Sequence, residues 1–262
     1  MLTVYKSRGY RPASFEDLEA VPVTPRGERS DRWMGVQHAE LVTGIKECFQ
    51  DAGMNIKKSQ YALQKTGHGL VGGFVFDTVP GTEAAENRVD SRIPDYDLAA
   101  GFMHDNQSRR GLRLALGATV RICMNGMVTG EVVWRRKHTR GLVLNDWLRE
   151  GVQTFMGNIQ NSNEKIERLG DIRLDTPSRH DADHVLVTLG RRKVLSWKNV
   201  GKVNELWNKP THEEFREPTA FNLYQAFNEV VKTVPMQNQF RALNRGFRVF
   251  ETELLSARAG MN

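Results

Sequence analysis

The sequence predicts an α+β fold with an antiparallel sheet of about five strands, a helix before the sheet and a mostly helical C-terminal half. Strand-like segments rich in β-branched and aromatic residues dominate residues 33–140, whereas apolar residues recur at helical intervals from residue 142 onward. Strands in one half of a chain and helices in the other are typical of this class. We therefore expect an α+β core over 33–140 and a helical part over 141–262 packed on it, preceded by an arm over 1–32.

The N-terminal arm, residues 1–32, is predicted to be basic and partly irregular, because it contains several prolines and arginines and shows neither a helical nor a strand period. A helix over roughly 35–52 should follow, since its apolar residues form one stripe. Ser30 or Asp31 could cap its start, and Gly53 is expected to end it.

The next segments are predicted to be mainly strands. Ile56 to Leu63 and Leu70 to Phe76 should form a hairpin around the turn at 66–69, with the glycines at 72 and 73 weakening or bulging the second strand. Further strands are expected near 96–104, 118–124 and 130–138, beyond a polar gap at 80–95. We interpret the spacing of Leu112, Leu114 and Leu116 as a short helix over 107–116.

The C-terminal half is predicted to consist of amphipathic helices. The first should run from 142 to about 168, because apolar residues recur there every three or four positions. Further helices are expected at 180–190, 219–234 and 237–256, with Ser178 and Thr219 near two of their starts. The apolar residues of the last two helices either complete the core or join subunits.

Composition favours an anionic partner and a reducing compartment. The 37 lysines and arginines exceed the 31 aspartates and glutamates, which gives a formal charge of +6 and favours polyanions. Cys48 and Cys123 lack metal-type spacing and are expected to be reduced core thiols. No apolar run approaches a membrane span, and the N-terminus lacks the apolar centre of a signal peptide. We therefore predict a cytoplasmic protein without a membrane contact and without a cofactor.

The most informative stretch is GEVVWRRKHTRG at 130–141, where a strand passes directly into a cluster of cations. Alternation along the strand would place Trp134 and Arg136 on one face and Arg135 and Lys137 on the other. Arginines suit phosphates, and an indole suits an unstacked base. The alternative is an edge strand whose charges only prevent aggregation.

Two further basic groups accompany this stretch. Arg109, Arg110 and Arg113 lie at the start of the predicted short helix, and Arg191, Arg192 and Lys193 follow a later helix. If the first group and the strand end converged on one rim, they would form a groove for phosphates. The candidate nucleic-acid-binding residues are Arg109, Arg110, Arg113, Trp134, Arg135, Arg136, Lys137, His138 and Arg140.

Other clusters permit metal or acid-base chemistry, but a structural role is favoured for each. His180 and His184 would share a helix face, yet the glutamate of the HExxH motif is absent. His104 with Asp105 and His138 could be ligands or an acid-base pair, although hydrogen-bonded structural histidines are expected more often. Asp95, Asp97 and Asp105 could hold Mg²⁺ for a nuclease, but no acid-x-lysine pattern completes the motif. No Walker-type loop occurs, which argues against ATP hydrolysis.

Three separated strings of the chain carry a family resemblance. They are VQHAELVTGIKECFQDAGMNIKKSQYAL at 36–63, MHDNQSRRGLRLALGATVRICMNGMVTGEVVWRRKHT at 103–139 and LWNKPTHEEFREPTAFNLYQAFNEVVKT at 206–233. In this order they resemble the phage and plasmid proteins of domain of unknown function 932. The resemblance covers roughly residues 33–255; Met103 and Met124 depart from the family's pattern, which has a small polar residue and an aspartate there.

The resemblance implies a companion of phage replication and recombination genes. The family's order of helix, antiparallel strands and further helices is similar to the core of single-strand annealing recombinases, which form rings holding DNA in a basic groove. The leading hypothesis is therefore a non-enzymatic single-stranded DNA-binding protein that acts as a homo-oligomer and promotes annealing. The alternatives are a Mg²⁺-dependent nuclease and a phage protein that binds and inhibits a host defence complex through its apolar C-terminal helices.

Overall fold

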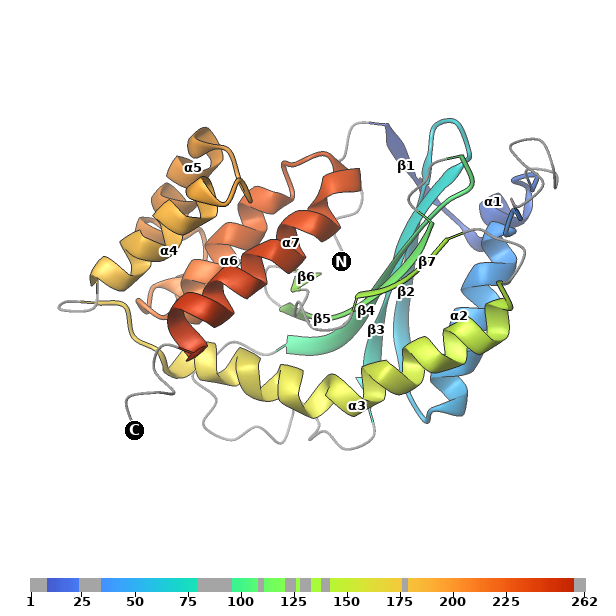
Figure 1. Cartoon of the computed structure of the whole chain (residues 1–262), viewed down its shortest axis with the longest axis horizontal. Helices are drawn as coiled ribbons and strands as arrows, with labels where there is room; N and C mark the ends of the chain where they lie inside the picture. The colour runs from blue at the N-terminus through green and yellow to red at the C-terminus, as the bar shows by residue number, and fades with distance from the viewer. Residues whose placement is uncertain are drawn as a thin grey trace.

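A computed structural model describes residues 9–23, 34–79, 96–107, 111–120, 126–127, 133–137, 142–175 and 179–256. It confirms the α+β class: an antiparallel sheet is followed by a helical half (Figure 1). The sheet has seven described strands where about five were predicted, in the order β1-β2-β3-β4-β5-β6, and β7 pairs with β5 as well.

The elements have the following bounds. The strands are β1 (Tyr10–Ala13), β2 (Asn55–Gln64), β3 (Gly69–Thr78), β4 (Tyr96–Asp105), β5 (Leu112–Val120), β6 (Gly126–Met127) and β7 (Val133–Arg136). The α-helices are α1 (Phe15–Glu19), α2 (His38–Asp51), α3 (Leu144–Asp171), α4 (Arg179–Arg191), α5 (Trp197–Asn208), α6 (Ala220–Val231) and α7 (Met236–Phe250). A short 3₁₀ turn, η3 (Glu213–Phe215), precedes α6, and a π-helical turn, η4 (Glu251–Ser256), continues α7.

The N-terminal arm is more regular than predicted, because it contains β1 and α1. β1 pairs antiparallel with β2 at the sheet edge, where Pro12 needs no backbone donor. Ser14 and Asp17 form a reciprocal capping box that starts α1. Local capping and edge pairing therefore order part of a segment that has no helical or strand period.

The predicted hairpin and the strand after it are confirmed as β2, β3 and β4. The predicted short helix over 107–116 is wrong, because β5 begins at Leu112. Leu112 and Leu114 are buried in the main core while Arg113 between them is half-buried on the other face. A spacing of two is the period of a strand, and β4 pairs with β5 from Arg113 to Val120.

One hydrophobic core runs through both halves of the molecule. In the sheet half, α2 and α3 cover one face, and the ring of Phe49 lies 4.9 Å from that of Phe76 and 5.4 Å from that of Phe155. In the helical half, Tyr224 packs on Phe250 with ring centroids 5.0 Å apart. The long helix α3 passes beneath both halves (Figure 1) and contributes to both parts of this core.

The start of α2 is fixed by an interaction that local spacing did not predict. Ser30 and Asp31 lie outside the described residues, and Gln37 caps the helix instead. The buried amide of Asn106, just after β4, accepts from the Val36 backbone N–H at 3.1 Å and donates to the Val36 carbonyl at 2.9 Å. The end of β4 therefore holds the entry to α2. Gly53 follows the helix with a φ of 77°, as expected for a glycine stop.

The predicted helices of the C-terminal half are confirmed, and Thr219 caps α6 by accepting from the Asn222 N–H at 3.2 Å. Ser178 lies outside the described residues. The sequence reasoning missed α5. Within the described residues, no helix combines the length and the apolar character that crossing a bilayer requires. Cys48 is buried, which raises the pKa of its thiol, and Cys123 lies outside the described residues.

Candidate nucleic-acid interface

The strongest candidate site is the place where β7 pairs with the start of β5. The register sets Arg113 directly opposite Arg135, and Leu112 opposite Arg136. Arg135, Arg136 and Lys137 are exposed, and Arg113 is half-buried. Directly opposite residues of an antiparallel pair have Cβ atoms about 4.5–5.5 Å apart. Arg113 and Arg135 therefore lie close together on one sheet face, although they are distant in sequence.

A tight approach of the two strands brings these cations together. Gly111 has a φ of 62°, and a Cβ atom at this position would overlap the backbone carbonyl of Arg136. Glycine therefore allows the chain before β5 to lie against the end of β7. Among the described residues, Arg135 and Lys137 have no carboxylate partner.

The register separates Trp134 from the Arg113–Arg135 pair. Position 134 pairs with Leu114, which is buried in the main core, whereas position 135 pairs with Arg113 on the other face. The predicted alternation along this strand is thus confirmed. The stacking of a base on Trp134 stays a prediction, with position 134 on the face opposite Arg135. Arg109, Arg110, His138 and Arg140 lie outside the described residues.

The aspartates proposed for a magnesium site do not converge. Asp97 and Asp105 lie eight residues apart on the continuous strand β4, which separates them by roughly 26 Å at strand rise. One ion binds oxygens at about 2 Å, so these two residues cannot share it. Asp95 lies outside the described residues, and within them no group of three or more metal-binding side chains gathers.

His104 belongs to a buried pair, and its partner is His38. The two Nδ1 atoms lie 2.8 Å apart, and Nε2 of His38 lies 2.8 Å from the carbonyl of Gly67. Since a carbonyl only accepts, His38 carries its proton on Nε2, and its Nδ1 accepts from Nδ1–H of His104. Burial lowers the pKa of His38 and outweighs the opposing effects of Gly67 and Asp105. His38 is therefore a neutral structural group, and His104 is its buried hydrogen-bond partner.

The other histidine pair lies on the surface and forms no metal site. His180 is within 2.9 Å of Asp181, and Nε2 of His184 is 2.9 Å from Oε2 of Glu253. Each ring thus has a carboxylate partner of its own. This agrees with the favoured interpretation of the HDADH segment as a solvated helix start.

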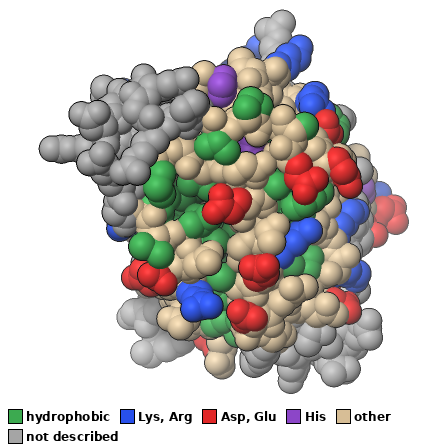
Figure 2. All heavy atoms as spheres, turned by 90° about the vertical axis from the view of Figure 1, so that its right-hand side faces the viewer, with side chains coloured by type: hydrophobic (Ala, Val, Ile, Leu, Met, Phe, Trp, Pro, Cys, Tyr) green, Lys and Arg blue, Asp and Glu red, His purple; other side chains and the backbone are tan. Residues whose placement is uncertain are grey.

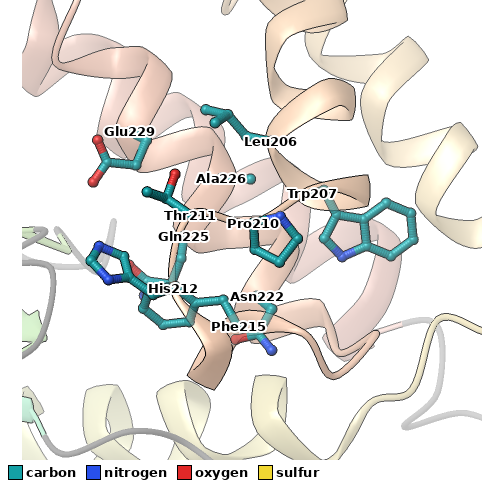
Figure 3. A pocket seen from close by; sticks show the side chains of 10 residues that line it. All are labelled: Leu206, Trp207, Pro210, Thr211, His212, Phe215, Asn222, Gln225, Ala226 and Glu229. Atoms are coloured by element: carbon teal, nitrogen blue, oxygen red, sulfur yellow. The ribbon is translucent and has the colours of Figure 1, made fainter.

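A small pocket lies between α5 and α6, and its lining includes none of the predicted site residues (Figure 3). Its volume of about 140 Å³ is close to that of a cavity that holds one benzene ring. The carboxylate of Glu229 accepts from Lys232 at 2.6 Å, and His212 packs edge-on against Phe215. The carboxylate of Glu229 and the ring of His212 therefore each have a structural partner within the protein. The pocket is lined by Leu206, Trp207, Pro210, Thr211, His212, Phe215, Asn222, Gln225, Ala226 and Glu229.

The apolar residues of the C-terminal helices complete the core of this chain. Phe221, Tyr224, Phe227 and Phe247 are fully buried, with Phe250 beside them. They are consequently not available as the exposed surface that a host protein or a second subunit would bind.

The face over α1, α2 and the start of α3 carries both signs of charge (Figure 2). Glu47 and Asp51 are exposed on α2, and Arg149 and Glu150 on α3. A phosphate backbone would meet carboxylates on this face, so it does not extend the basic strand end.

Comparison with family models, curated proteins and solved structures found no match. The resemblance to the phage and plasmid family of domain of unknown function 932 stays a prediction.

Proposed function

We propose that this protein binds single-stranded DNA through the basic end of β5 and β7. The observation that carries the proposal is the cross-strand placement of Arg113 opposite Arg135, with the exposed Lys137 next along the same face. Guanidinium groups pair with phosphate oxygens through short, charge-assisted hydrogen bonds.

Annealing of strands by a homo-oligomer in a phage or plasmid setting is the second part of the proposal. It rests on the family resemblance and on the formal charge of +6, which favours a polyanionic partner. A nuclease is not favoured, because Asp97 and Asp105 occupy opposite ends of one strand.

A salt titration of a labelled oligo(dT) strand tests the first part. We expect affinity to fall with the logarithm of salt concentration, by a slope of about 0.7 per phosphate contact on single strands. The double variant Arg135→Gln/Lys137→Gln removes two contacts and should lower the slope by about 1.4.

The matched control is Lys58→Gln/Lys65→Gln, which removes the same charge from exposed positions at β2 and the turn after it. The proposal predicts a clearly smaller effect for this control. Absence of salt-dependent binding by the unmodified chain, or equal losses in both double variants, would overturn it.

A further inference from the structure

An exposed tryptophan lies at the corner between α4 and α5. Trp197 is 59% exposed and is the one aromatic among the exposed large hydrophobic residues of the described chain. It is the first residue of α5, after the capping residue Ser196. Its six-membered ring lies over Gly190 of α4, where an added Cβ would be 2.5 Å from Cζ3. The indole is therefore held in place by α4 while more than half of its surface meets solvent.

The residues around Trp197 in the sequence are rich in cations and contain no acid. From His184 to Asn204 the chain contains no aspartate or glutamate, and Arg191, Lys193, Lys198 and Lys202 are exposed. Arg192 pairs with Glu253 at 3.0 Å. Within the described residues the other four cations form no ion pair. The α4–α5 corner, residues 191–202, thus combines a ring with four available positive charges.

Lys193 has an unusual backbone for a lysine. Its φ is 52°, and among the described residues it is the one non-glycine residue with a positive φ. Its N–H donates to the Gly190 carbonyl at 3.0 Å in the turn that ends α4, a position that glycine occupies at lower cost. Strained residues of this kind cluster at binding sites. The turn itself therefore does not call for a lysine at 193.

We infer that the α4–α5 corner is a second contact for single-stranded DNA, with one base stacked on Trp197 and phosphates paired with Lys193, Lys198 and Lys202. This inference rests on the proposed function and adds a surface remote from the first, since α6 and α7 lie between this corner and the sheet (Figure 1). An exposed indole beside lysines is the arrangement that stacks bases and follows a backbone without reading sequence.

The triple variant Lys193→Gln/Lys198→Gln/Lys202→Gln tests the phosphate contacts in a salt titration with oligo(dT). We expect the slope of log affinity against log salt to fall by about 2.1, from about 0.7 per contact. The matched control, Lys58→Gln/Lys65→Gln/Lys209→Gln, removes equal charge from exposed positions elsewhere and should change the slope much less.

Trp197→Ala tests the stacking. We expect binding of oligo(dT) to weaken by about 5- to 150-fold, which corresponds to the loss of one stacked base. Trp197→Phe retains a ring and should restore most of the affinity. Binding to a duplex of the same length should change little, because its bases are not free to stack. Equal losses on single and double strands would overturn the stacking role.

Lys193→Gly separates binding from folding. We expect it to weaken oligo(dT) binding while the melting temperature stays the same or rises, because glycine adopts this φ without strain. If the triple variant and Trp197→Ala bind like the control, the second contact is refuted and the proposed function stands. If the unmodified chain shows no salt-dependent binding, both are refuted.

Discussion

The sheet half and the helical half of the molecule place histidine in opposite surroundings. His38 and His104 are 1% and 0% exposed and hydrogen-bond to each other between α2 and β4. The side chain of His184 on α4 is 60% exposed and faces the carboxylate of Glu253. Burial lowers the pKa of His38 in the first pair, whereas the second ring meets both a carboxylate and solvent. The role of each histidine therefore depends on a partner that is distant in sequence. His104 meets His38, and His184 meets Glu253, only in the folded chain.

Aromatic residues form the centre of the core in both halves, and α3 contributes residues to the cluster that contains them. Phe155 of α3 packs against Phe49 and Phe76 in the sheet half. In the helical half, Phe227 stacks on Tyr224 with ring centroids 5.7 Å apart. Because both sets belong to one continuous cluster, we expect the halves to unfold together.

The largest predicted effect tests this joint unfolding. Phe155→Ala and Phe227→Ala should each lower the free energy of unfolding by about 3–5 kcal/mol, the cost of a large cavity in a core. Urea denaturation followed by circular dichroism and by tryptophan fluorescence should give coincident curves for both variants. The exposed Val143 provides a control, because Val143→Ala should change stability by less than about 0.5 kcal/mol. Separate transitions, each shifted by one variant alone, would show two independent cores.

The sequence predicted the elements with a clear period better than the contacts between them. The hairpin of β2 and β3 and the helices α2, α3 and α6 were found from local patterns. The leucines of β5 lie two residues apart, which is the period of a strand and not of the predicted helix. α5 was missed even though Ser196 caps it and Val200, Val203 and Trp207 recur at helical spacing.

The candidate site depended on information that local patterns do not hold. The strand end at Arg135–Lys137 could be recognised as basic, but its pairing with Arg113 required β5 to be recognised as a strand. The partner of His104 is His38, 66 residues away in sequence. Local sequence instead suggests a pair of His104 with the adjacent Asp105. Trp197 carried a signal that was overlooked, namely a tryptophan between lysines in an acid-free stretch.

The second predicted effect concerns the buried pair and its pH dependence. His104→Leu removes the donor to Nδ1 of His38 and should cost about 1–3 kcal/mol, because that nitrogen stays buried. In the unmodified chain the pKa of His38 is lowered by burial. The unfolded state therefore binds more protons, and the free energy of unfolding should fall as pH decreases from about 6.5 toward the lowered pKa.

Urea denaturation at several pH values between 5 and 8 measures this dependence. The double variant His38→Gln/His104→Leu should have a flatter profile over this range than the unmodified chain, because it lacks both buried imidazoles. An unchanged profile would mean that other groups cause the acid sensitivity and that the buried pair is not its source.

The smallest predicted effect belongs to the exposed pair of the helical half. His184→Gln should change the free energy of unfolding by less than about 1 kcal/mol, because exposed ion pairs are screened by water and salt. Glu253 also accepts from Arg192 at 3.0 Å, so its carboxylate keeps a partner when His184 is replaced. Denaturation at low and high salt checks this expectation. A loss as large as that of His104→Leu would contradict the contrast between the two halves, since it would make an exposed histidine as costly to replace as a buried one.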